Sequence, residues 1–167
     1  MLFRSDWRAC GWYTLDGPGG TPEYPTAVRG ATIVKGDVLT HDFPDESFDA
    51  VVGISSIEHI GLGHYDADPL DPEGDRHCME RIVRWLKPGG WVYLDVPFDA
   101  KGYHVEGDSH RVYDDAAIQG RLIVPGLTCR RRWYGRLEFL PEIEAALADT
   151  GPAVPWSIVA ILARKGD

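Results

Sequence analysis

The sequence has few cysteines, no long apolar segment and no internal repeat. Its three cysteines (Cys10, Cys78 and Cys129) are widely spaced and include no C-x-x-C pair, which argues against a disulfide framework and a zinc knuckle. No apolar run approaches the roughly 20 residues of a membrane-spanning helix, and residues 1–6 lack the apolar stretch of a secretory signal. These absences predict a cytoplasmic protein without a membrane partner.

Basic residues are scarce relative to acidic ones. The chain has 17 Lys and Arg against 26 Asp and Glu, which gives a formal net charge of -9. Such a protein repels a phosphate backbone, so nucleic acid is not the expected partner, and a small neutral or cationic molecule fits better. The 167 residues, of which 44% are hydrophobic, suit one globular domain spanning residues 1–167.

Apolar segments alternate with turn sequences in the order of an α/β protein. Residues 2–10 suit the last turns of a helix, which Gly11 would end. The remaining pattern predicts strands at 12–16, 31–38, 48–55, 91–96, 127–134 and 157–163, and helices at 72–87, 114–122 and 141–148. Strands that alternate with helices predict a Rossmann-like fold, in which a mostly parallel sheet carries helices on both faces.

Polar residues follow several of the predicted strands. In parallel α/β sheets the ligand crevice lies beyond the carboxyl ends of the strands. That rule selects Asp16, Asp37, the sequence SSIEH at 55–59 and the sequence PFD at 97–99. We therefore expect the functional site where these segments meet.

The strand-end residues, in this order, resemble the class I S-adenosylmethionine-dependent methyltransferases. Three segments carry the resemblance: residues 35–52, which contain KGDV and FPDESFDAVV, the sequence SSIEHI at 55–60, and LKPGG at 86–90. The resemblance implies a transferase that moves a methyl group from S-adenosylmethionine to a small molecule or a sugar. In this chemistry, positioning of the reactants and exclusion of water supply much of the rate.

The resemblance also implies the residues that bind the cofactor. Asp16 matches the acidic residue that binds the ribose hydroxyls. Asp37 matches the residue that accepts a hydrogen bond from the adenine amino group, and Val38 matches the residue that packs on the adenine ring. Ser55 and Ser56 begin the segment that closes over the cofactor and faces the substrate.

An oxygen acceptor would also require a base. Glu58, His59 and His110 are the candidates, because burial and neighbouring charges can tune their pKa values toward neutrality. Plainer roles stay open, since Asp37 is also a common turn residue and Glu58 and His59 also suit the cap of a short helical turn. The loop with His64, Asp66, Asp68 and Asp71 lacks the spacing of a calcium loop, so no metal is expected.

The first segment of the family pattern is absent from this sequence. Methyltransferases begin with a strand and a glycine-rich loop that lets the backbone approach the cofactor. About ten residues precede Trp12, fewer than the roughly 25 to 30 of a βα unit, and the sequence GPGG at 17–20 follows the wrong strand.

We therefore expect a truncated domain whose sheet lacks its first strand. Unpaired strand edges in a core are costly, so three arrangements are possible. The strand predicted at 12–16 pairs directly with the strand predicted at 48–55, a second copy covers the edge in a homo-oligomer, or cofactor binding is weakened or lost. The last arrangement corresponds to the alternative function, a non-catalytic methyltransferase-like binding or scaffold domain.

Overall fold

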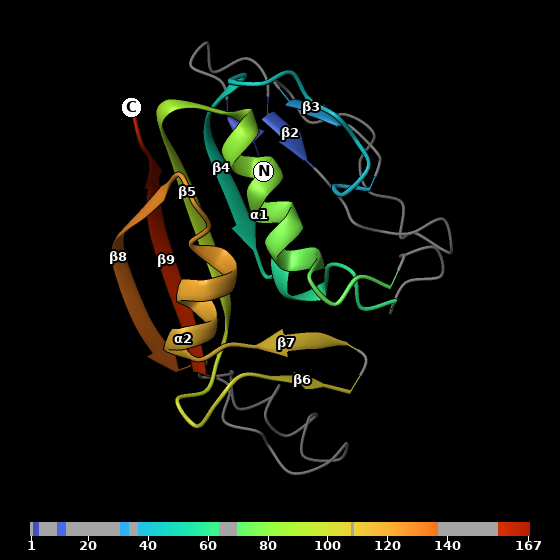
Figure 1. Cartoon of the computed structure of the whole chain (residues 1–167), viewed down its shortest axis with the longest axis vertical. Helices are drawn as coiled ribbons and strands as arrows, with labels where there is room; N and C mark the ends of the chain where they lie inside the picture. The colour runs from blue at the N-terminus through green and yellow to red at the C-terminus, as the bar shows by residue number, and fades with distance from the viewer. Residues whose placement is uncertain are drawn as a thin grey trace.

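A seven-stranded sheet is the framework of the molecule (Figure 1). The computed structural model describes residues 2–3, 10–12, 31–33, 37–63, 70–107, 109–136 and 157–167. Its elements, in chain order, are β1 (Leu2–Phe3), β2 (Cys10–Trp12), β3 (Ala31–Ile33), β4 (Phe48–Ile54), η1 (Ile57–His59), α1 (Gly74–Trp85), β5 (Leu86–Phe98), β6 (His104–Glu106), β7 (His110–Val112), α2 (Asp115–Ala117), η2 (Ile118–Leu122), β8 (Leu127–Arg136) and β9 (Ser157–Lys165).

The sheet has the order β3-β2-β1-β4-β5-β9-β8. β1 is antiparallel to β2 and to β4, and β9 is antiparallel to β5 and to β8. The other five strands of this sheet therefore run in one direction, and β2 with β3 and β4 with β5 form its parallel pairs. This arrangement confirms the predicted Rossmann-like α/β architecture. Five of the seven strands in the described sheet share one direction, but four of its six strand pairs are antiparallel, so the pairing is less parallel than predicted.

The place between β2 and β4, where the resemblance leaves a gap, is occupied by β1. Leu2 pairs with Gly11 on one side and with Val51 on the other. The expectation of a helix over residues 2–10 is wrong at Leu2–Phe3 and at Cys10, because the pairing partners decide the conformation of so short an apolar segment. Since β1 is antiparallel to β4, the two strands end at opposite ends of the sheet.

Helix α1 begins two residues after its predicted start. Its buried residues include Cys78, Met79, Ile82 and Trp85, which lie on one face at helical spacing. The helix ends at Trp85 because the next residue, Leu86, is extended and already pairs with Phe48 of β4. The predicted turn at 86–90 therefore lies within the start of β5, where Gly89 takes up the positive φ of 73°.

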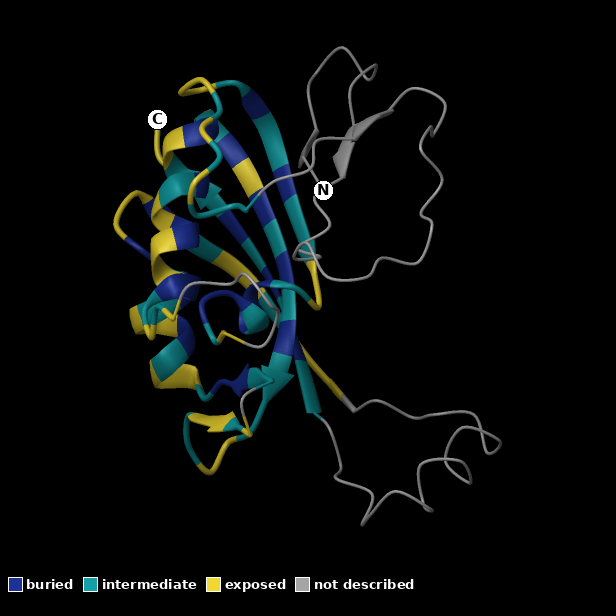
Figure 2. Ribbon diagram, turned by 90° about the vertical axis from the view of Figure 1, so that its right-hand side faces the viewer, coloured by how far each residue is buried: buried dark blue, intermediate teal, exposed yellow. Residues whose placement is uncertain are grey.

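The described helices pack on one face of the sheet (Figure 2). Val92, Leu94 and Val96 alternate along β5 with their side chains buried on this face. The described core joins these residues to Met79 and Trp85 of α1. Each such burial contributes about 1.5–3 kcal/mol. The helix predicted at 141–148 lies outside the described residues.

Residues 99–111, where no helix or strand is predicted, contain a hairpin. Strands β6 and β7 pair antiparallel between His104 and Val112, and they lie across the end where β4 and β5 finish (Figure 1). The polar sequence lacks apolar alternation, so its strand structure could not be read from periodicity. After the hairpin, Asp114 caps α2 as predicted, and its carboxylate accepts the Ala117 amide at 2.6 Å. Helix α2 then widens into the π-helical η2.

Candidate functional site

The carboxyl end of β4 meets a polar side chain of β5. Ile54 of β4 pairs with Asp95 of β5, and the backbone amide of the next residue, Ser55, donates to Asp95 Oδ1 at 2.7 Å. Ser55 has a φ of +43°, which is strained for a residue with a side chain. The strand therefore ends in a sharp turn that directs the chain into η1, the short helical turn that contains Glu58 and His59.

Glu58 of η1 is a buried acidic residue beside this turn. Its side chain is 1% exposed, and its Oε1 accepts the Ser55 hydroxyl at 2.9 Å. Its Oε2 has no hydrogen-bond partner among the residues that the structure describes. Burial raises the pKa of Glu58 above its ordinary value, against the effect of its own backbone amide and of His59. An acidic group of this kind can hold or accept a proton.

His59 lies between Glu58 and the hairpin. Its Nδ1 is 2.5 Å from the backbone carbonyl oxygen of Ser109. A carbonyl only accepts hydrogen bonds, so Nδ1 carries the proton and the neutral ring has its lone pair on Nε2. Nε2 is 3.7 Å from Glu58 Oε1. The imidazole is therefore oriented by the hairpin and directed toward the buried carboxyl group.

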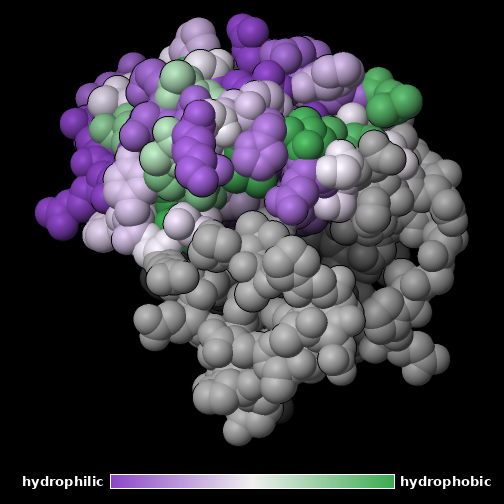
Figure 3. Space-filling model, turned by 90° about the horizontal axis from the view of Figure 1, so that it is seen from below, coloured by the Kyte–Doolittle hydropathy of each residue, from purple (hydrophilic) through white to green (hydrophobic). Residues whose placement is uncertain are grey.

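His110 of β7 completes the group of predicted bases. Its ring centroid is 5.9 Å from that of His59, and its Nδ1 is 2.7 Å from the Ser109 hydroxyl. Burial lowers the pKa of His110, against the effect of Glu106 and with that of His59. The structure thus brings together Glu58, His59 and His110, which are far apart in the sequence. Figure 3 views this end of the molecule, where the described surface is mostly hydrophilic.

Arg111 of β7 holds the backbone of this cluster in place. It is fully buried, and its guanidinium donates to the carbonyl oxygens of Glu58 at 3.3 Å and Ile60 at 2.6 Å. It also donates to those of Asp71 at 3.2 Å and Pro72 at 3.3 Å. It therefore ties η1 to the segment that precedes α1. Sequence analysis assigned no role to Arg111, and nothing in the sequence signals that it is buried.

The predicted cofactor residue Asp37 lies in a turn. Its Oδ1 accepts the Leu39 amide at 2.8 Å, and its carbonyl oxygen accepts the His41 amide at 2.8 Å. The strand predicted over 31–38 therefore ends early, since Asp37 favours the turn by bonding its own backbone. Val38, in the same turn, packs against the hydrophobic core.

The remaining predicted cofactor residues lie in different regions. Ser55 belongs to the cluster around Glu58, and Ser56 precedes η1 and accepts the His59 amide at 3.3 Å through its carbonyl oxygen. Asp16 lies outside the described residues, as do His64, Asp66 and Asp68 of the acidic loop. Among the described residues, no group of three or more His, Cys, Asp or Glu side chains could hold a metal ion. No helix in this part of the chain is long and apolar enough to cross a membrane.

The sequence matches one family model over most of this region. Residues 33–130, more than half of the chain, match a family described as "Caenorhabditis protein of unknown function, DUF268". The chain belongs to the DUF268 family. The matched residues include all of η1, α1, β5 and the β6–β7 hairpin, so the whole polar cluster lies within the DUF268 region. No curated protein matches the chain.

Solved structures similar to the DUF268 chain have the class I methyltransferase fold. It is 17% identical to the cyclase SpnF, with a TM-score of 0.57 over 81% of this chain and 57% of SpnF. It is 16% identical to the Burkholderia thailandensis 1,6-didemethyltoxoflavin-N1-methyltransferase with bound S-adenosylhomocysteine, with a TM-score of 0.57 over 83% of this chain and 52% of that one. It is 15% identical to the Bradyrhizobium japonicum N-methyltransferase NodS in complex with S-adenosylhomocysteine, with a TM-score of 0.54 over 84% of this chain and 57% of NodS. The DUF268 chain therefore spans little more than half the length of these structures.

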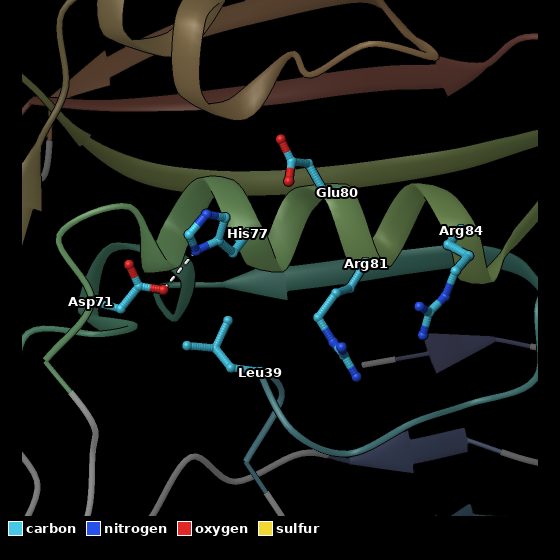
Figure 4. A pocket seen from close by; sticks show the side chains of 6 residues that line it. All are labelled: Leu39, Asp71, His77, Glu80, Arg81 and Arg84. Atoms are coloured by element: carbon cyan, nitrogen blue, oxygen red, sulfur yellow. Dashed lines mark hydrogen bonds and ion pairs between the residues drawn. The ribbon is translucent and has the colours of Figure 1, made fainter.

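A cavity of about 410 Å³ lies along the outer face of α1 in the DUF268 chain. At one end, His77 Nδ1 is 2.6 Å from Asp71 Oδ2. Burial acts to raise the pKa of Asp71, but the hydrogen bonds from His77 and from the Glu73 amide outweigh it and lower the pKa. Figure 4 shows the side chains that line this cavity: Leu39, Asp71, His77, Glu80, Arg81 and Arg84.

Arg81 connects this cavity to the turn that contains Asp37. Its Nε donates to the Val38 carbonyl oxygen at 3.0 Å, and one of its terminal nitrogens donates to that of His41 at 2.5 Å. Two bonds from one rigid guanidinium fix both ends of the turn. Helix α1 of the DUF268 chain therefore sets the position of Asp37 through Arg81.

Proposed function

We propose that the chain is a methyltransferase that uses S-adenosylmethionine and acts on a small molecule or a sugar. The observation that carries the proposal is the polar cluster at the carboxyl ends of β4 and β5, where Glu58 is buried with one oxygen lacking a described partner. In open α/β sheets this is the end at which ligands bind. Two similar structures were determined with S-adenosylhomocysteine, which adds support.

The acceptor chemistry of the described residues fits the nucleoside part of the cofactor. Ribose hydroxyls and an adenine amino group donate hydrogen bonds, so a complementary site offers acceptors. Within the described part of the chain, one carboxylate oxygen of Asp37 is engaged, by the Leu39 amide, and its second oxygen suits the adenine amino group. We assign Asp37 and Val38, with Asp16, to the nucleoside, and Ser55 and Ser56 to the segment beside it.

The chain's own residues would then act on the acceptor. A bound S-adenosylmethionine supplies an electrophilic methyl group, and the protein has to place the acceptor in line with it. Glu58, His59 and His110 lie at the end of the sheet where the acceptor would enter. Their role is to bind the acceptor and to receive its proton.

A second candidate function is a non-catalytic methyltransferase-like binding or scaffold domain. The direction of β1 favours it. A strand that ends in the family's glycine-rich loop is parallel to β4, whereas β1 is antiparallel to β4. β1 therefore runs toward the end of the sheet opposite to Ser55, which is not the direction of the strand that precedes the family's cofactor loop.

Titration calorimetry with S-adenosylhomocysteine separates the two functions. The proposal predicts binding that Asp37→Asn weakens at least tenfold, which corresponds to about 1.4 kcal/mol. The asparagine oxygen still accepts the Leu39 amide and keeps the turn, but its amino group replaces the second acceptor oxygen. Asp45→Asn, which alters an exposed carboxylate paired with Arg84, is the matched control and leaves binding unchanged. Absence of binding in the wild type supports the scaffold instead.

A further inference from the structure

We propose that Glu58 and His59 form a single acid–base unit, in which His59 Nε2 takes the proton of an acceptor hydroxyl or amine and Glu58 stabilises the resulting imidazolium. The inference rests on the proposed function, because it assigns the proton transfer within that site. Ser55 and Ser109 are positioning residues of the unit. His110 lies beside the unit and outside it.

The orientation of His59 is the first argument. Its Nδ1 donates to the Ser109 carbonyl oxygen at 2.5 Å, which fixes the tautomer with the lone pair on Nε2. The same Nε2 is 3.7 Å from Glu58 Oε1. The side chain is 26% exposed while Glu58 is 1% exposed, so a ligand reaches the imidazole before the carboxyl group. His59 is therefore the contact, and Glu58 is the partner behind it.

The environment of Glu58 is the second argument. Its Oε1 is held by the Ser55 hydroxyl at 2.9 Å, and Ser55 is itself fixed by Asp95 through its amide. Its Oε2 is buried without a hydrogen-bond partner among the described residues. Such an oxygen costs free energy unless a proton or a ligand satisfies it. An imidazolium 3.7 Å from Oε1 would stabilise the negative charge of the same carboxyl group.

Among the residues that the structure describes, the other charged groups near the unit do not duplicate it. Asp95 on β5 acts on Glu58 as a second negative charge and raises its pKa further. On the hairpin, Glu106 lies 3.6 Å from His110 Nε2, and His104 opposes protonation of His110. The Arg111 guanidinium is directed to the Glu58 carbonyl oxygen rather than to its carboxyl group. Among the described residues, Glu58 therefore supplies the carboxyl group that pairs with His59.

The proton transfer balances within the proposed reaction. As the acceptor's oxygen or nitrogen bonds to the methyl carbon, the bond from that carbon to the sulfonium sulfur breaks and leaves its electron pair on sulfur. The acceptor's proton passes to Nε2 of His59, which becomes a cation. The Glu58 carboxylate neutralises this charge, and the proton later leaves to solvent through the exposed edge of the ring.

Nuclear magnetic resonance of the protein labelled with ¹⁵N histidine and ¹³C glutamate tests the unit without a substrate. We expect His59 to show the Nδ1–H tautomer in the unaltered protein, and the Glu58 carboxyl carbon to report the titration of Glu58. His59→Gln should raise the titration midpoint of Glu58, because His59 acts to lower the pKa of that carboxyl group. Glu106→Gln is the matched control and should lower the pKa of His110 while the Glu58 midpoint stays unchanged.

Two results overturn the inference. One is an Nε2–H tautomer of His59 in the unaltered protein, a measurement that needs no variant to fold. The other is an unchanged Glu58 midpoint in His59→Gln with a native amide spectrum. Failure here is distinct from failure of the proposed function, because S-adenosylhomocysteine binding is measured separately. If S-adenosylhomocysteine binds but His59 and Glu58 are not coupled, the acid–base unit alone is refuted. If the two residues are coupled but S-adenosylhomocysteine does not bind, the methyltransferase assignment is refuted.

Discussion

Two buried carboxyl groups on the same side of the sheet have contrasting surroundings. Asp75 of α1 is fully buried and accepts the Tyr113 hydroxyl at 2.9 Å and two Arg121 nitrogens at 2.8 and 2.6 Å. Glu58 is equally buried but accepts one described side-chain hydrogen bond, from Ser55, and has an oxygen without a described partner. The first is satisfied and paired with a cation, and the second is not.

The difference separates a carboxyl group with a structural role from one suited to the proposed function. The hydrogen bond to Asp75 raises the pKa of Arg121, and this pair joins α1 to η2. Burial also raises the pKa of the Tyr113 hydroxyl, which remains a donor to Asp75. At Glu58 the same burial raises the pKa of the carboxyl group instead. Proteins tolerate such an arrangement mainly where a ligand or a proton completes it.

Removing the charge of Asp75 should have the largest effect. Asp75→Asn leaves the mostly buried Arg121 guanidinium with the half-exposed Glu73 carboxylate as its remaining partner, and we expect a loss of about 3 kcal/mol in the free energy of unfolding. Urea denaturation measures this loss. Glu80→Gln on the same helix, which breaks an exposed pair with Arg76, should cost less than about 1 kcal/mol. Equal effects would remove the distinction between the two sites.

Arg111 contacts both regions, so its substitution should weaken both. Its Nε is 3.6 Å from Asp75 Oδ1, and its terminal nitrogens bond backbone carbonyls of η1 and of the segment before α1. The single ammonium of Arg111→Lys cannot reach all of these acceptors. We expect a loss of about 2–3 kcal/mol and faster amide hydrogen exchange at residues 57–60. Arg130→Lys, at an exposed position, is the control. Slow exchange at residues 57–60 in Arg111→Lys would contradict the role of Arg111 in holding η1.

Ser55 provides a matched pair of substitutions on the Glu58 side. Both Ser55→Ala and Ser55→Gly remove the hydroxyl that bonds Glu58. Only glycine relieves the strain of the positive φ, so Ser55→Gly should be more stable than Ser55→Ala by about 1 kcal/mol. Chemical denaturation of the two variants gives the difference. Equal stability would mean that the turn relaxes without the glycine.

Neutralising Glu58 should have the smallest effect, and its size depends on pH. A carboxyl group with a raised pKa contributes stability below its ordinary value of 4.5, and that contribution is lost as the pH rises through the folded pKa. Glu58→Gln is neutral throughout, so its stability relative to wild type should rise with pH. We expect a gain of about 0.5 kcal/mol at pH 8 and none at pH 4, measured by urea denaturation. A difference independent of pH would refute a raised pKa of Glu58.

The core of the fold could be predicted from the sequence because its signals are local. Met79 and Ile82 recur at helical spacing and are buried as expected. The strand predicted at 91–96 after them is also observed, within the longer β5. The β6–β7 hairpin escaped prediction because its stability comes from contacts of the buried Arg111 with segments 40 or more residues away, and no local pattern records such contacts.

The residues of the candidate site that follow the end of a strand could be predicted from the sequence. The rule for parallel sheets selected Ser55, Glu58 and His59, and the structure brings them together with His110. It missed Asp95, which lies inside a predicted strand. The role of Asp95 depends on the register that pairs it with Ile54, and strand register is a tertiary property. For the same reason the contact of Ser109 with His59 was invisible in the sequence.

The hairpin offers separate positions for engineering. Arg111 and Val112 face inward, whereas Val105 and His104 are exposed on the neighbouring strand. A designer who wishes to retune what enters this end of the sheet can therefore diversify residues 104 and 105 and retain the inward positions as a fixed anchor. A library confined to these two codons samples new surface chemistry while the scaffold keeps its architecture.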